Sequence, residues 1–337
     1  MFFTASRKND PRPMVAVRLP TNVKETMLEQ RQPNEPPPIR TAWKVAAFAG
    51  MSAAGIVTLQ IGSTIVDILE LPVVARLFRL TLNPCCVFGA TWICLRVLER
   101  KPLAAVGIGF DRPWKTDLSL GWVGGMVMFS VCALALLVFC KASLSSSTSS
   151  VPSLGQSAWI CLCVAAAEEG LFRGYAFQIL ARWNRGAALV IAGMGFLLLH
   201  ADNPGVGSPG PLINLALVHV LFAVCYLRTR SLWLPIGVHG GWNFALGSIF
   251  GFPVSGKSMG PSLLTTSVEP GAWSGGDFGP EGGWMATIVI VAGIILAMTM
   301  LKPRTPEPDL LSESSEKKLT ALPMANSDSI PRDFRSP

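Results

Sequence analysis

Three charged side chains lie together inside one apolar stretch of the sequence, and they are the first candidates for chemistry. The segment AAAEEGLFRGYAF holds Glu168, Glu169 and Arg173. An ionised side chain at the centre of a bilayer costs about 2.5–3.5 kcal/mol on insertion scales. If the stretch crosses a membrane, these side chains therefore require partners or water, and spanning alone gives no reason to have them.

Helical spacing divides the three residues into a pair and a single carboxylate. Glu169 and Arg173 are four residues apart with the acid first, which is the favourable order for an ion pair. Glu168 lies about 100° around the helix from Glu169 and has no local cation. One interpretation is that all three only fix helix packing. We favour the other, in which the pair is structural and Glu168 is a desolvated carboxylate. Desolvation raises the pKa of a carboxyl group, and a raised pKa suits a general base.

The chain has three histidines, and all of them lie in apolar stretches. His200 ends the segment FLLLH, and His239 precedes Asn243 by four residues, so His239 and Asn243 share one face of a helix. His219 follows Asn214 by five residues, which turns the two about 140° apart. We interpret His200, His239 and Asn243 as functional, and His219 as a structural residue that hydrogen-bonds between helices.

The composition indicates that these residues lie in a membrane protein. Half of the 337 residues are apolar, the mean hydropathy is +0.45, and 15% are charged, against about a quarter in soluble domains. The apolar residues form long blocks, which excludes a soluble α/β enzyme. The eight cysteines lie inside these blocks without metal-type spacing, so we interpret them as buried small hydrophobic residues.

Eight apolar blocks approach the length of about 20 residues that a membrane helix needs. They are residues 45–66, 78–98, 118–140, 156–178, 186–201, 212–227, 231–250 and 284–301. Lys and Arg concentrate in the two tails and in alternate loops, so the positive-inside rule places both termini in the cytoplasm. This distribution explains the net charge of +7 without a nucleic-acid partner. The sequence thus predicts an all-α membrane protein of about eight transmembrane helices.

The remaining segments predict the domain organisation. Residues 1–42 are rich in proline and lack periodicity, so we expect a disordered cytoplasmic tail with no cleavable signal, and residues 303–337 are expected to be a second such tail. Residues 43–302 form the predicted transmembrane domain, with its motif core at 156–250. The polar 143–150 segment and the Gly- and Pro-rich 251–283 segment are expected as outer loops. Gly237, Gly240 and Gly241 around His239 are expected to permit close helix approach.

Taken together, three short segments of the chain resemble the motifs of a known family. EEGLFR at 168–173, FLLLH at 196–200 and HGGWN at 239–243 are similar to the EExxxR, FxxxH and HxxxN motifs of the CAAX-protease and bacteriocin-processing family, also called Abi or type II CAAX prenyl endopeptidases. The resemblance extends over about residues 90–285 and includes RKPLAAVGIGF and GGDFGPEGG. His219 departs from the family, in which a small residue is more usual.

The resemblance implies an intramembrane endopeptidase that cleaves a membrane-associated peptide or protein, with membrane lipid as its surroundings. In that family's terms, Glu168 is the catalytic base that activates water together with His200. His239 and Asn243 stabilise the oxyanion, and the Glu169–Arg173 pair supports the site. The branch features imply a bacterial inner membrane, and whether the substrate is prenylated stays open.

Two further questions stay open at this point. Glu168, His200 and His239 could hold zinc, because two nitrogens and one oxygen form a common ligand set. The chain lacks an HExxH motif and Glu169 is best explained by Arg173, so we favour a metal-free glutamate mechanism without a cofactor. The alternative functions are a transporter or proton relay, disfavoured by the lack of a clear internal repeat, and a non-catalytic scaffold or immunity-type protein.

Overall fold

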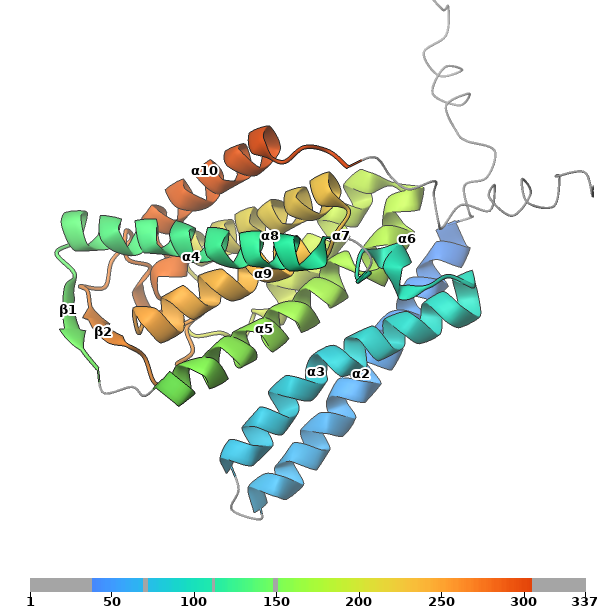
Figure 1. Cartoon of the computed structure of the whole chain (residues 1–337), viewed down its shortest axis with the longest axis horizontal. Helices are drawn as coiled ribbons and strands as arrows, with labels where there is room; N and C mark the ends of the chain where they lie inside the picture. The colour runs from blue at the N-terminus through green and yellow to red at the C-terminus, as the bar shows by residue number, and fades with distance from the viewer. Residues whose placement is uncertain (1–37, 69–71, 111–112, 148–150, 305–337) are drawn as a thin grey trace, which may run out of the picture. The chain divides into compact units, whose positions relative to one another are not determined.

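Helices make up most of the protein in a computed structural model, shown in Figure 1. Both predicted tails, 1–42 and 303–337, lie almost entirely outside the residues that the structure describes. The described residues are 38–68, 72–110, 113–147 and 151–304.

Each of the eight apolar blocks lies almost entirely in helical structure, and three of them divide into two helical segments. The α-helices are α2 (Pro38–Ile68), α3 (Pro72–Cys94), α4 (Trp114–Phe139), α5 (Val151–Arg173), α6 (Tyr175–Trp183), α7 (Arg185–Leu199), α8 (Pro209–Thr229), α9 (Trp233–Asn243) and α10 (Trp284–Met300). Two π-helical segments extend α3 and α9, namely η1 (Leu95–Glu99) and η3 (Phe244–Ile249). Short 3-10 segments are η2 (Leu103–Val106), η4 (Gly276–Phe278) and η5 (Pro280–Gly282).

Four described segments are long and apolar enough to cross a bilayer. They are Arg40–Thr64, Leu80–Glu99, Trp114–Phe139 and Pro209–Thr229. The helices α7 and α10 are apolar but shorter. The protein is therefore a mostly helical integral membrane protein.

The predicted fourth span, residues 156–178, is not one continuous helix. It begins earlier, at Val151, and is interrupted at Gly174, after which α6 starts in a new direction. A Cβ atom on Gly174 would lie 2.1 Å from the carbonyl oxygen of Gly170. Only glycine can therefore occupy this bend, which directly follows Arg173.

Parts of the two predicted outer loops are not irregular but pair as strands. β1 (Ser143–Ser146) and β2 (Leu264–Ser267) form a two-stranded antiparallel sheet, with Ser143 opposite Ser267. Figure 1 shows this sheet beside the end of α4. The pairing joins segments about 120 residues apart and brings both loops to the same end of the molecule.

The helices α4 and α9 pack closely through glycines on both surfaces. A Cβ on Gly121 would lie 2.3 Å from the Leu234 oxygen, and one on Gly241 would lie 2.0 Å from the Trp122 oxygen. Such close backbone contact between spans is the expected use of small residues four apart. The predicted close approach at Gly237 and Gly241 is therefore confirmed, and it fixes the position of His239.

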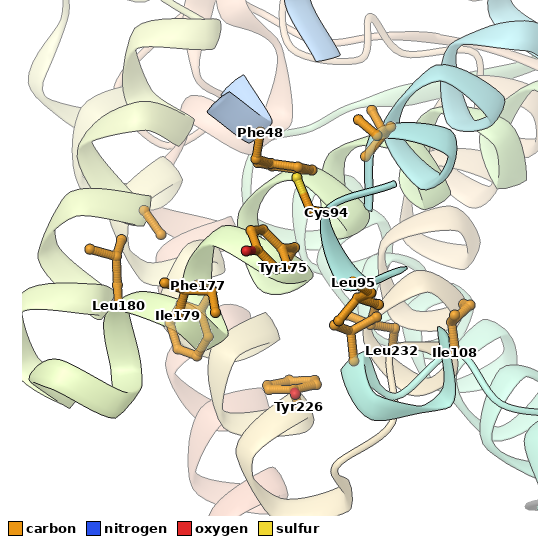
Figure 2. Packing of buried hydrophobic residues seen from close by; sticks show 14 of the residues in the cluster. Phe48, Cys94, Leu95, Ile108, Tyr175, Phe177, Ile179, Leu180, Tyr226 and Leu232 are labelled. Atoms are coloured by element: carbon orange, nitrogen blue, oxygen red, sulfur yellow. The ribbon is translucent and has the colours of Figure 1, made fainter. Parts of the chain in front are cut away.

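A buried apolar cluster joins α2, η1, α6, α8 and the start of α9 (Figure 2). Phe48 of α2 lies 5.7 Å from Tyr175 of α6, and Phe177 lies 6.0 Å from Tyr226 of α8, measured between ring centroids. The Tyr175 hydroxyl donates to Glu99, which also pairs with Lys44 and Arg182. These contacts hold α6, and with it the C-terminal end of α5, against its neighbours.

A second set of polar contacts ties the end of α10 to the start of α4. The Arg304 guanidinium donates to both carboxylate oxygens of Asp117, at 2.6 and 2.7 Å. The Arg304 amide donates to the Arg228 carbonyl at the end of α8, at 2.8 Å. These three helix ends therefore lie together. The hydrogen bond and charge of Asp117 raise the pKa of Arg304.

All eight cysteines are free thiols, but their burial is less uniform than the sequence predicts. Five are buried, whereas Cys86 and Cys140 are partly exposed and Cys85 is exposed. The interpretation as buried hydrophobic residues is therefore wrong for Cys85, which lies on α3 in a surface of the hairpin formed with α2.

Candidate active site

Glu169 and Arg173 form the buried ion pair that their spacing predicts. The Arg173 Nη1 lies 3.2 Å from the Glu169 Oε1, and neither side chain has any exposed surface. Arg173 has a second partner on α8, because its Nη2 donates to Nδ1 of His219 at 2.8 Å and to the His219 carbonyl at 3.1 Å. A buried charge needs such partners to be tolerated.

His219 connects three helices, as its structural interpretation predicts. Its Nδ1 accepts from Arg173 of α5, and its Nε2 donates to the Leu189 carbonyl of α7 at 3.1 Å. This pattern assigns the neutral ring with the proton on Nε2. The imidazole accepts from Arg173 and so ties α8 to the buried ion pair.

His239 of α9 lies between the two glutamates of α5. Its Nδ1 donates to the Glu169 Oε1 at 3.1 Å, because a carboxylate oxygen can only accept. Its Nε2 faces the Glu168 Oε2 at 3.9 Å. The ring stacks on Phe222 with centroids 4.9 Å apart and planes inclined by 16°. The ring is thus held in one orientation, with Nε2 turned toward Glu168.

Glu168 differs from its neighbour in both partners and access. Its side chain keeps 18% of its surface exposed, whereas Glu169 keeps none. The Oε2 atoms of both carboxylates are buried without a hydrogen-bond partner in the described structure. Glu169 Oε1, however, is bonded to Arg173 and His239, whereas Glu168 has no hydrogen bond to another described residue. Of the two carboxylates, Glu168 is therefore the one that can bind a water molecule.

His200 is located at the end of α7, where the helix stops. Its Nδ1 donates to the Phe196 carbonyl at 2.9 Å, and the two rings lie 4.7 Å apart. This bond leaves Nε2 as the available nitrogen. Within the described residues no hydrogen bond or ion pair joins His200 to Glu168 or His239. The structure therefore pairs Glu168 with His239, whereas His200 approaches from a different helix.

Asn243 is the last residue of α9 and lies one turn beyond His239. Its side chain is buried, with 5% of its surface exposed. The helix changes to the π-helical segment η3 directly after it. Such π-helical turns are frequent at functional sites because they redirect side chains. The amide makes no hydrogen bond in the described part of the chain, so its donor is available.

Aromatic rings surround the charged group. The Arg173 guanidinium lies 5.2 Å from the centroid of Phe196 and 5.3 Å from that of Phe222, within the range of cation–π contacts. Phe222 also covers one face of His239. These rings exclude water from the Glu169–Arg173 pair, which leaves Glu168 as the exposed edge of the group.

The proposed zinc ligands do not converge in this arrangement. Among the described residues, no three His, Cys, Asp or Glu side chains gather closely enough to hold a metal ion, and this includes the set Glu168, His200 and His239. One nitrogen of His239 is already engaged by Glu169. These three side chains therefore do not fit a zinc site.

One carboxylate near the site was not identified from the sequence. Glu281 lies in the GGDFGPEGG segment and accepts a hydrogen bond from the indole of Trp242, the residue before Asn243. Burial raises the pKa of this carboxyl group, and the charge of His200 offsets part of that effect. The available signal was an acidic residue between proline and glycine directly before an apolar helix, but no local pattern links it to Trp242.

Comparison with known proteins identifies one match. Residues 150–245 match a family described as Rce1-like, type II CAAX prenyl endopeptidase Rce1-like. The matched segment contains all three motifs, and it confirms the family resemblance there. No curated protein and no solved structure matches the chain.

Proposed function

We propose that the protein is an intramembrane endopeptidase that hydrolyses a peptide bond of a membrane-associated substrate. The observation that carries this proposal is the unpartnered carboxylate oxygen of Glu168 facing Nε2 of His239 at 3.9 Å. The family match over residues 150–245 supports CAAX-type protease activity.

Glu168 is the proposed general base. The 3.9 Å separation from His239 is too long for a direct hydrogen bond, and a water oxygen about 2.8 Å from each atom would bridge them. Glu168 removes a proton from this water as its oxygen attacks the scissile carbonyl carbon. When the carbon–nitrogen bond breaks, Glu168 returns the proton to the leaving amine. One proton transfer of this kind contributes about 10²- to 10⁴-fold to the rate.

His239 and Asn243 are the proposed oxyanion donors. The Asn243 amide is a neutral donor, which is cheaper to bury than a charged one. His239 can donate from Nε2 once that nitrogen is protonated, because Glu169 already accepts from Nδ1. Glu168 and Glu169 lie on both sides of this ring, so they stabilise the positive charge that it then carries. Fixed donors in a site of low dielectric are effective at stabilising an oxyanion.

His200 is proposed to assist the water from the end of α7. Its Nδ1–H is fixed by Phe196, so the lone pair of Nε2 can accept a hydrogen bond from the water or from the substrate. Binding of a peptide between α7 and α9 would then bring Glu168, His200 and Asn243 onto one reacting centre. Catalytic hydrogen bonds are often long before substrate binds.

The proposed topology has eight crossings of the inner membrane of a bacterial cell, with both termini in the cytoplasm. The pairing of β1 with β2 and the junction of Arg304 with Asp117 support it. The first brings together the loops after α4 and before α10, and the second brings together the opposite ends of these helices. Reporter fusions at residues 147 and 304 should therefore report opposite sides of the membrane.

The decisive experiment compares wild-type protein with Glu168→Ala in two assays. Purified protein in liposomes is incubated with a farnesylated peptide that ends in a CAAX sequence. In parallel, the membrane proteome of cells carrying each form is searched for a peptide that accumulates uncleaved. We expect wild type, but not Glu168→Ala, to cleave the farnesylated peptide, or an uncleaved peptide to accumulate in the cells that carry Glu168→Ala.

The alternative functions predict different results. A transporter or proton relay gives pH-coupled uptake that tolerates loss of the Asn243 amide. A non-catalytic scaffold gives identical proteomes for wild type and Glu168→Ala. Identical proteomes, together with an uncleaved farnesylated peptide, would contradict the protease proposal.

A further inference from the structure

The loop at residues 276–283 contacts the neighbours of three site residues. Its Phe278 is 1% exposed and belongs to one buried cluster with Phe172 and Phe196. Phe172 precedes Arg173, and the backbone carbonyl of Phe196 accepts a hydrogen bond from His200. Its Glu281 accepts from Trp242, which precedes Asn243. A loop outside the matched family segment is thus packed against α5, α7 and α9 at their functional positions.

The Glu281 carboxylate has three hydrogen-bond donors. The Trp242 Nε1 donates to Oε1 at 2.9 Å. The amide and hydroxyl of Ser255 donate to Oε2, at 2.5 and 3.0 Å. Two oxygens that only accept are the pattern of an ionised carboxylate. Burial raises the pKa of Glu281 above its usual value, and these donors and the charge of His200 offset only part of this effect.

The backbone around Glu281 is fixed independently of its side chain. The Asn214 amide of α8 donates to the carbonyls of Glu281, at 2.7 Å, and of Gly283, at 2.9 Å. The hydroxyl of Thr287 donates to the Asn214 Oδ1 at 2.7 Å. A Cβ on Gly210 would lie 2.0 Å from the Gly282 oxygen. The carboxylate therefore extends from a rigid support toward Trp242.

We propose that Glu281 is a positioning residue of the active site, which holds Trp242 and thereby the end of α9 from which Asn243 presents its amide. This inference deepens the proposed function and rests on it for the role of Asn243. The π-helical segment η3 begins directly after Asn243, so the helix geometry changes at this residue. The Glu281–Trp242 bond holds the side chain next to this change.

The test uses Glu281→Gln, Trp242→Phe and the double variant. Phe keeps the ring that packs 5.2 Å from Phe129 and removes only the N–H donor. Gln keeps the size of Glu281 and loses its charge and one acceptor. Asp277→Asn is the matched control, because Asp277 is an exposed carboxylate in the same loop.

The kinetic expectation is a loss in kcat without a matching change in KM. Each single variant should lower kcat about 10- to 100-fold, as expected when a catalytic group is misplaced, and the double variant should be no slower than the slower single variant. Asp277→Asn should match wild type. Wild-type kcat in Glu281→Gln, or independent losses that multiply in the double variant, would overturn the proposal.

A second readout needs no substrate. The side-chain amide resonance of Asn243 and the indole N–H resonance of Trp242 are identified with Asn243→Ala and Trp242→Phe. The chemical shifts of both resonances should change in Glu281→Gln and stay the same in Asp277→Asn. If wild type cleaves nothing, the proposed function fails, and these resonances still decide the positioning role. An unmoved Asn243 amide in folded Glu281→Gln overturns it.

Discussion

Nδ1 of His239 and Oε1 of Glu169 are joined by a hydrogen bond of 3.1 Å between α9 and α5. The same oxygen also accepts a hydrogen bond of 3.2 Å from Nη1 of Arg173. Glu169 is therefore more than the counter-ion of Arg173, because it also sets which nitrogen of His239 faces Glu168. The orientation of one candidate catalytic group thus depends on the buried ion pair beneath it.

Glu168→Gln should abolish cleavage while leaving the protein folded. The amide cannot accept a proton from water, so the rate should fall by about 10²- to 10⁴-fold. Glu168 Oε2 has no hydrogen-bond partner in the described structure, so little stability depends on its charge. The measurement is cleavage together with thermal unfolding in detergent. Glu269→Gln, an exposed carboxylate in the 251–283 loop, is the control, and equal activity of Glu168→Gln and wild type would refute the role of base.

Glu169→Ala should be strongly destabilising, because it leaves the Arg173 guanidinium buried without a counter-ion. Breaking a buried pair in this way typically costs about 3–5 kcal/mol. Replacing both residues, as Glu169→Ala with Arg173→Met, should restore part of this loss because no buried charge remains. Thermal unfolding of the two single variants and the double variant measures the coupling. Additive losses would show that the pair does not act as a unit.

His219 and His239 should separate by phenotype. His219→Phe removes a partner of Arg173 and should cost about 1–3 kcal/mol, but His219 contacts neither Glu168 nor His239 among the described hydrogen bonds. Cleavage should therefore persist at a temperature at which the variant is folded. His239→Phe should abolish cleavage at that temperature, because its Nε2 is lost. A stable but inactive His219→Phe variant would place His219 in the catalytic group instead.

The helical character of the apolar blocks and the Glu169–Arg173 pair were predictable from the sequence because each is a local property. Apolar blocks of about 20 residues predict spans, and a spacing of four predicts a pair on one helix face. The contacts of His239 with Glu169 and of Glu281 with Trp242 join residues 70 and 39 positions apart. No local spacing encodes such contacts, since they arise from the packing of whole helices.

The bend at Gly174 and the β1–β2 pair were not predicted either. Gly174 lies inside an apolar block, where hydropathy alone predicts continuation of the helix. The close approach of this position to the Gly170 carbonyl is local, but hydropathy does not record it. Strand pairing between the two polar loops needs their ends to be adjacent, and that adjacency follows only from the arrangement of α4 and α10. Loop composition carries no information about it.

Gly241→Ala should separate α9 from α4 and move His239. The added Cβ would lie 2.0 Å from the Trp122 carbonyl oxygen, and a backbone atom cannot be displaced as a side chain can. Overpacking typically costs about 1–3 kcal/mol, and displacement of a catalytic group by about 1 Å can cost about 10²-fold in rate. Both unfolding temperature and kcat should fall. Gly124→Ala is the matched control on α4, where nothing lies within 4 Å of the new atom, and an equal effect there would contradict the packing argument.

Chelation should leave cleavage by the purified protein unchanged. A zinc hydrolase of the type considered needs three protein ligands and an open position, whereas in the described structure Glu168, His200 and His239 do not form such a set. His239 would also have to give up the contact of Nε2 with Glu168 or that of Nδ1 with Glu169 to bind an ion. The measurement is cleavage after exhaustive treatment with a chelator, with metal content determined on the same sample. Activity that is lost on chelation and returns with zinc, but not with magnesium, would replace the glutamate mechanism by a metal-dependent one, because the three side chains would then have to converge on the ion.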